Sequence, residues 1–179
     1  MGECWIVADI PDEDILGRDY PDADVMVLRI DSADARDRNA RAVVERAAAQ
    51  LDLFAQDENS RVILVTEYRK GQHYEEFVVE LENALHERFP RCHAVVANRS
   101  IDNWILADIE ALAGHFKYLK KKPQRIYEGE NSEDAFKDLL VDAKKMDGKR
   151  RKELFEHVTL DDAKDYSDSL ARLMKALNI

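Results

Sequence analysis

This 179-residue chain lacks most of the patterns that mark specialised classes of protein. Its two cysteines, Cys4 and Cys92, have no Cys-x-x-Cys or Cys/His spacing around them, so we expect buried core residues and no structural zinc. No apolar run approaches the roughly 20 residues of a membrane span, and the first residues turn acidic too early for a signal peptide. A phosphate-binding loop, a dinucleotide fingerprint and a nucleophile elbow are also missing. We therefore expect a cytoplasmic protein that does not bind membranes.

Positive charge is scarce as well, because 27 lysines and arginines stand against 37 aspartates and glutamates, for a formal net charge of −10. Such an acidic total argues against nonspecific nucleic-acid binding as the main property. Acids dominate residues 1–60, whereas bases dominate residues 117–152. The candidate nucleic-acid or phosphate-binding residues in that basic region are Lys120, Lys121, Lys122, Arg125, Lys149, Arg150, Arg151 and Lys152. The same residues also suit an acidic protein partner or an ordinary solvated loop.

What the chain does contain is a regular alternation of short apolar runs and amphipathic stretches. Strands are expected at residues 4–8, 25–30, 61–65 and 92–97. Helices are expected at residues 33–55, 74–89, 102–116, 132–146 and from Thr159 onward, with a helical turn at 12–16, a loop at 118–131 and a basic connector at 148–152. This order predicts an α/β fold, with a mostly parallel four-stranded sheet flanked by helices and a helical C-terminal extension. We expect the α/β domain to span residues 1–116 and the basic loop and helical extension, residues 117–179, to pack on it.

Carboxylates follow each of the four expected strands, with Asp31 directly after the second. Asp9 and Asp12 come after the first strand, Glu67 after the third and Asp102 after the fourth. Ligands of open parallel sheets bind beyond the carboxyl ends of the strands, so these positions are the first place to look for a site.

The segment after the first strand resembles a motif of the TOPRIM (topoisomerase–primase) domain. That family carries a glutamate there, in a Val-Glu-Gly-x-x-Asp-x-x-x-Leu pattern, and this chain reads VADIPDEDIL. Val7, Asp12 and Leu16 match, whereas Ala8 stands where the glutamate is expected and Asp9 where the glycine is expected. The resemblance implies a TOPRIM-like sheet over about residues 3–112.

After its third strand the TOPRIM family carries an Asp-x-Asp pair, often with a glycine nearby. Here Thr66 and Tyr68 stand at the two aspartate positions, and Gly71 remains. Mg²⁺ demands hard oxygen ligands, which alanine lacks and neutral tyrosine supplies poorly. The resemblance therefore implies a phosphoryl-transfer fold that has lost its metal ligands, and we expect no cofactor.

A second resemblance covers SIDNWILADIEAL, residues 100–112. The run is similar to an Ile-Glu-x-Trp-Leu-Leu-Ala-Asp segment of small TOPRIM-related proteins, with Asp102 in place of the glutamate. Some members of that group are encoded beside ATPases and are suspected phage-defence nucleases, which implies a protein partner of that kind. From the helical pattern alone, we expect Trp104 to be a core residue and Asp108 to make a structural hydrogen bond or salt bridge.

Three functional hypotheses follow. The first is a catalytically degenerate TOPRIM-like binding or regulatory subunit in an ATPase or nuclease system. The alternative is a Mg²⁺-dependent nuclease with relocated carboxylates, in which Asp9, Asp12, Glu67 and Asp102 are catalytic and Asp9, Asp12 and Asp102 hold the metal. A third hypothesis is a structural or regulatory dimer. The one-residue displacement of Asp9 and Glu67 from the family positions counts against the alternative, because neighbouring residues of a strand point to opposite faces.

Overall fold

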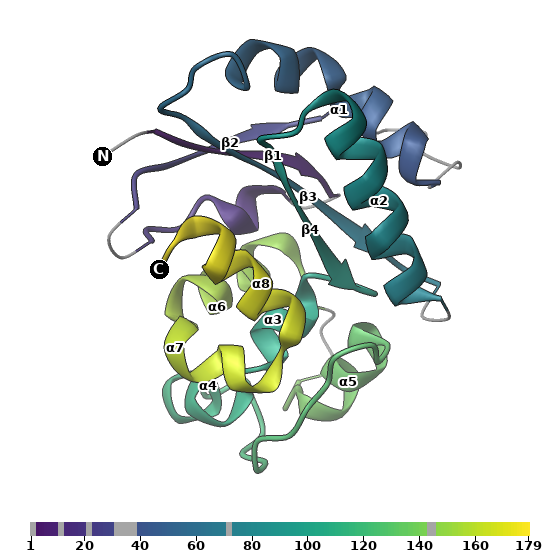
Figure 1. The fold of residues 1–179 in the computed structure, drawn as a ribbon. Coiled ribbons are helices and arrows are strands. Elements are labelled where there is room, and N and C mark those ends of the chain that lie inside the picture. Colours follow the sequence, from purple (N-terminus) through teal and green to yellow (C-terminus); the bar gives the residue numbers. More distant parts are fainter. Residues whose placement is uncertain (1–2, 11–12, 21–22, 31–38, 71–72, 143–145) are drawn as a thin grey trace.

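The computed structural model describes residues 3–10, 13–20, 23–30, 39–70, 73–142 and 146–179. In these segments four strands form one sheet in the order β2-β1-β3-β4, and every neighbouring pair is parallel (Figure 1). The strands are β1 (Cys4–Asp9), β2 (Val25–Arg29), β3 (Arg61–Tyr68) and β4 (His93–Asn98). The expected α/β fold with a parallel sheet is confirmed.

One face of the sheet is covered by α1 (Ala40–Phe54) and α2 (Tyr74–Arg88). Their apolar stripes meet strand residues such as Val7 and Leu64, which are fully buried in a shared core. Both helices connect parallel strands, as the crossover connections of a parallel sheet require. The helix expected at 33–55 corresponds to α1, which runs from Ala40 to Phe54. Residues 33–38 lie outside the described segments.

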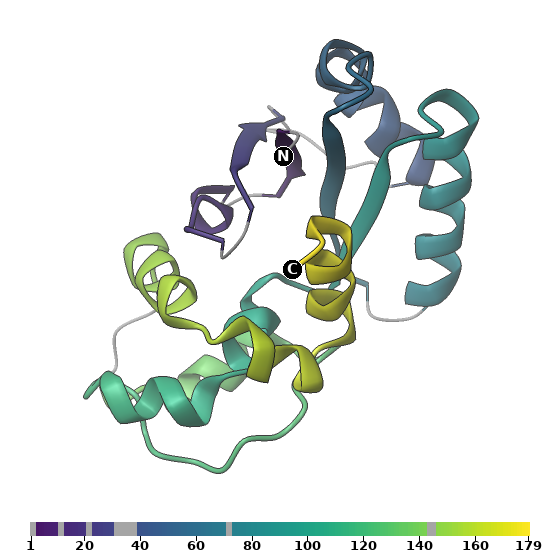
Figure 2. The same cartoon turned by 60° about the vertical axis from the view of Figure 1, so that its left-hand side comes forward.

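The other face carries the remaining helices, which in Figure 2 lie on the side of the sheet away from α1 and α2. They are η1 (Glu13–Leu16), α3 (Asp102–Leu106), α4 (Ile109–His115), α5 (Ser132–Leu139), α6 (Gly148–His157), α7 (Leu160–Ala163), η2 (Lys164–Tyr166) and α8 (Asp168–Leu177). One core joins Ile6 of the sheet to Trp104 and Leu177. Trp104 is fully buried and donates its Nε1 hydrogen to Ser169 Oγ at 2.7 Å, as expected of a core residue. No helix of the described segments is long and apolar enough to cross a bilayer.

Strand β3 is three residues longer than expected. Its pairing with β4 continues to the Tyr68–Asn98 pair, so Thr66 and Tyr68 lie inside the strand rather than beyond it. Threonine and tyrosine both favour the pleated, half-buried setting of a strand. Gly71, the remaining match to the family pattern, lies outside the described residues.

Three helix predictions need correction. The helix expected at 102–116 is two helices, because the backbone leaves the helical region at Asp108, whose φ is −128°. The helix expected at 132–146 ends at Leu139, after which Leu140 forms a β-bridge with Leu119. The helix expected from Thr159 onward is divided into α7, η2 and α8.

The basic connector expected at 148–152 is wrong, since these residues form the first half of α6. Asp147 is the N-cap of α6, and its side chain accepts a hydrogen bond from the Arg150 amide at 2.8 Å. Such a bond satisfies one of the free amides at a helix start, which explains why so charged a segment is helical.

Candidate functional site

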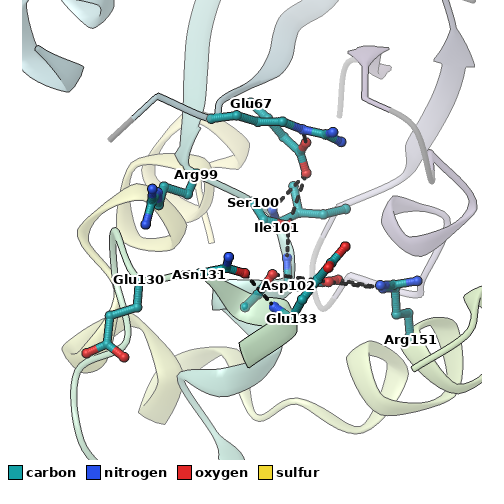
Figure 3. Close-up of a pocket in the computed structure, with 11 residues that line it drawn as sticks. Glu67, Arg99, Ser100, Ile101, Asp102, Glu130, Asn131, Glu133 and Arg151 are labelled. Atoms are coloured by element: carbon teal, nitrogen blue, oxygen red, sulfur yellow. Dashed lines mark hydrogen bonds and ion pairs between the residues drawn. The ribbon is translucent and has the colours of Figure 1, made fainter. Parts of the chain in front are cut away.

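A pocket of about 320 Å³ opens at the carboxyl ends of β3 and β4. Its walls come from the two strand ends, the start of α3, the first turn of α5 and Arg151 of α6 (Figure 3). The lining is mostly polar and carries both signs of charge, with Glu67 and Asp102 beside Arg69, Arg99 and Arg151. This position is where ligands of parallel sheets bind.

Glu67 lies one residue before the end of β3, and its side chain is 3% exposed. Its Oε1 accepts hydrogen bonds from the Ile101 amide at 3.0 Å and from Ser100 Oγ at 3.3 Å. Its Oε2 accepts from Arg69 Nε at 3.2 Å. The carboxylate therefore ties β3 to the segment that follows β4, and it has an arginine beside it.

Asp102, in the first turn of α3, has its own arginine. The Nε of Arg151 lies 3.0 Å from both carboxylate oxygens, and Ser132 Oγ lies 3.4 Å from Oδ2. Ser100 connects the two acids, because its hydroxyl donates to Glu67 and accepts from the Asp102 amide at 3.1 Å. Of the four predicted carboxylates, the structure thus brings Glu67 and Asp102 together in one network.

Asn103 holds the wall of the pocket in place. Its side-chain amide donates to the Asn98 carbonyl at 3.0 Å and to the Glu130 carbonyl at 3.2 Å, and the residue is 1% exposed. It therefore fixes the segment before α5 against the end of β4. At the rim, a hydrogen bond from Arg125 lowers the pKa of the Glu130 carboxyl.

Asp9 lies on the opposite face of the sheet. Its Oδ2 is 2.9 Å from Arg46 of α1, and Thr66 Oγ1 donates to the same oxygen at 3.3 Å. Thr66 is the residue paired with Asp9 in the β1–β3 register, and Glu67 comes one residue later. Because strand side chains alternate, Asp9 turns toward α1 while Glu67 turns toward α3. Asp12 lies outside the described residues.

These positions do not fit the magnesium site that the TOPRIM resemblance implies. Asp9 is on the wrong face, and Glu67 and Asp102 are each engaged by an arginine. Within the described segments, no group of three or more His, Cys, Asp or Glu side chains is arranged to hold a metal ion. Mg²⁺ in enzymes is usually bound by one or two carboxylates together with substrate phosphates. A carboxylate whose charge is already balanced by an arginine is a poor ligand for the ion.

The predicted phosphate-binding residues fall into two groups. Three arginines bind acids of the chain itself, Arg125 to Glu130, Arg150 to Asp142 and Arg151 to Asp102. The lysines are exposed at the surface, and they are Lys120, Lys121, Lys122, Lys149 and Lys152. The two basic segments approach each other where the Arg150 guanidinium lies 4.6 Å from the centre of the Tyr118 ring.

Several pocket residues were not predicted from the sequence. Arg99 and Ser100 directly follow β4, so the rule that ligands bind beyond strand ends could have selected them. Arg69 follows β3 in the same way. Asn131 and Ser132 could have been found only as the start of a helix, because nothing local indicates that this helix begins beside β4.

A comparison with models of known protein families found no match to this chain, and neither a curated protein nor a solved structure matches it significantly. The interpretation of the pocket therefore depends on its own geometry.

Proposed function

We propose that this protein is a catalytically degenerate member of the TOPRIM-like group that works by binding, as a non-enzymatic regulatory subunit of an ATPase or nuclease system. The observation that carries the proposal is the separation and neutralisation of the candidate metal ligands. Asp9 is paired with Arg46 on one face of the sheet, whereas Glu67 and Asp102 are paired with arginines on the other.

A divalent ion needs several uncompensated oxyanions within its coordination distance, and an arginine beside each carboxylate already supplies the positive charge. The pocket nevertheless remains open and polar, with hydrogen-bonding groups along its walls. A cavity with this lining suits recognition of a polar ligand. The exposed lysines of the basic region offer a separate surface for an acidic protein or a nucleic acid.

One observation favours the alternative function, a Mg²⁺-dependent nuclease with relocated ligands. Glu67 and Asp102 share one pocket and are linked through Ser100. If a substrate phosphate displaced Arg69 and Arg151, these two acids would face it. The alternative therefore requires both arginines to release their partners.

The deciding experiment combines metal titration with a cleavage assay. We expect calorimetry with Mg²⁺ and Mn²⁺ to detect no stoichiometric site, and single- and double-stranded DNA and RNA to stay intact in the presence of either metal. Metal binding or metal-dependent cleavage that disappears in Glu67→Ala and Asp102→Ala would overturn the proposal. Glu133→Ala is the matched control, because it removes an exposed acid from the same pocket.

A further inference from the structure

Arg99 has the most unusual backbone among the residues that line the pocket. Its φ is 71°, in the left-handed region that residues with a Cβ seldom adopt. Its amide donates to the Tyr68 carbonyl at 2.9 Å, which holds the residue directly beyond β4. Disfavoured backbone of this kind tends to occur where a side chain must be held in a particular place for function.

Among the described residues, the guanidinium of Arg99 is the cation of the pocket that has no partner within the protein. Arg69 binds Glu67 and Arg151 binds Asp102, but within the described residues Arg99 makes no hydrogen bond or ion pair through its side chain. The residue is half-buried at the pocket wall rather than extended into solvent. Figure 3 shows Arg99 and Arg151 on opposite sides of the pocket.

The balance of charge around Arg99 leaves it available to a ligand. Three of the four acids that line the pocket already have an arginine partner, namely Glu67, Asp102 and Glu130. Glu133 is the fourth, and it is exposed at the rim. A ligand that placed an anionic group on Arg99 and hydroxyl or amino groups near Glu133 would match both remaining charges.

We propose that this pocket binds a small phosphate ester, with the phosphate on Arg99 and the hydroxyl or amino groups of the ester toward Glu133 in the first turn of α5. This inference rests on the proposed binding function and names its ligand class. A phosphate is preferred to a carboxylate because it can carry two negative charges, and its additional oxygens can accept from other donors once two have accepted the fork of the guanidinium. The volume of about 320 Å³ lies at the lower end for small-molecule sites, which suits a compact ligand.

The test is a titration with inorganic phosphate, carried out by calorimetry and by amide chemical shifts in a chelator-containing buffer. We expect one saturable site, with the largest shifts at Ser100, Ile101 and Ser132. Acetate at the same ionic strength should bind more weakly. Absence of phosphate binding, shifts confined to other surfaces, or acetate binding as tight as phosphate would each overturn the proposal.

Arg99→Gly is the informative variant, because glycine adopts the same backbone without a side chain. We expect the melting temperature to stay the same or rise, and the phosphate affinity to fall about 10-fold or more, as loss of a charge-assisted hydrogen bond predicts. Arg99→Asn provides a second variant that tolerates this backbone. Unchanged phosphate affinity in either variant would overturn the proposal.

His73→Gly is the matched control, because His73 also has a positive φ, of 63°, but does not line the pocket. It should leave phosphate binding unchanged, and a loss of binding equal to that of Arg99→Gly would overturn the assignment to Arg99. Failure of phosphate binding leaves the proposed function standing, because that function is decided by the metal and cleavage assays. Metal-dependent cleavage would instead overturn the proposed function.

Discussion

The two faces of the sheet use their strand-end carboxylates differently. Asp9 is the last residue of β1 and Glu67 the last but one of the neighbouring β3, and they are 5% and 3% exposed. Asp9 is enclosed under α1, where Arg46 and Thr66 both donate to its Oδ2. Glu67 belongs to the wall of an open pocket and shares its hydrogen bonds with backbone and side chains of the loop beyond β4. Similar burial therefore accompanies an enclosed structural contact on one face and the wall of an open polar pocket on the other.

The difference follows from a single step in register. A displacement of one residue along a strand moves a side chain from one face to the other. The α1 face has long crossover helices that seal it, whereas the opposite face is covered by short helices whose starts leave space at the strand ends. Charge pairs on the two faces should accordingly differ in how much they stabilise the fold.

The largest effect is expected for Arg46→Ala on the closed face. It leaves the Asp9 carboxylate buried without its cation, and removing one partner of a buried pair costs about 3–5 kcal/mol. Urea unfolding measures the loss. The control is Arg88→Ala, which breaks exposed pairs with Glu45 and Asp52 and should cost no more than about 1 kcal/mol. Equal losses in the free energy of unfolding for the two variants would mean that the Asp9–Arg46 contact is not shielded from water.

An intermediate effect is expected for Asp102→Ala on the pocket face. Arg151 loses the Asp102 carboxylate, but it lines an open polar pocket where water can solvate it, so the cost should be about 2 kcal/mol. Urea unfolding of Asp102→Ala, Arg151→Ala and the double variant gives the coupling energy. A cost above that of Arg46→Ala would reverse the proposed contrast between the faces.

How much of this contrast was predictable depends on the range of the interactions. The apolar runs gave the four strands and the α/β fold, because burial in a parallel sheet leaves a local signal of continuous apolar residues. Trp104 was predicted as core from the helical period of its neighbours. These features need no knowledge of distant parts of the chain.

The site depends on information that the local sequence does not carry. To predict that Asp9 and Glu67 lie on opposite faces, one must know that β3 continues through Glu67. The end of β3 is set by its pairing with β4, which the local sequence does not show. The Asp102–Arg151 pair joins residues that are 49 positions apart in the sequence. Arg151 belongs to α6, which Asp147 caps, whereas the sequence predicts a basic connector at 148–152. Tertiary contacts of this kind override local charge patterns.

A smaller effect is expected for Glu67→Gln. Glutamine keeps an oxygen for the Ile101 amide, and the Arg69 side chain it no longer neutralises is 55% exposed. The variant should lose about 1 kcal/mol or less, because the hydrogen bond remains and the ion pair is partly solvated. The comparison is Asp9→Asn, measured in the same urea series, which should cost more because Arg46 is less exposed. The reverse order would show that the pocket acid, not the enclosed one, is the structural contact.

The smallest effect concerns pH and a third acid, Asp108, which lies between α3 and α4. Burial raises its pKa above the ordinary value of 3.8, although its hydrogen bond from the Thr159 amide, at 2.7 Å, opposes the shift. The folded chain therefore holds this proton more tightly than the unfolded chain. The contribution of protonated Asp108 to the stability of the fold is fully present below pH 3.8, and it is lost as the pH rises through the raised pKa of the folded state.

Asp108→Asn tests this sign, because asparagine cannot ionise but its side-chain oxygen can still accept from Thr159. We expect the free energy of unfolding of the variant, relative to that of the native protein, to be higher at pH 7 than near pH 4. Urea unfolding of both proteins at each pH measures this difference. A relative free energy of unfolding that is lower at pH 7 than near pH 4 would show that the charged carboxylate stabilises the fold. Asp108 would then resemble Asp9, a charge satisfied inside the fold, rather than an acid that burial disfavours.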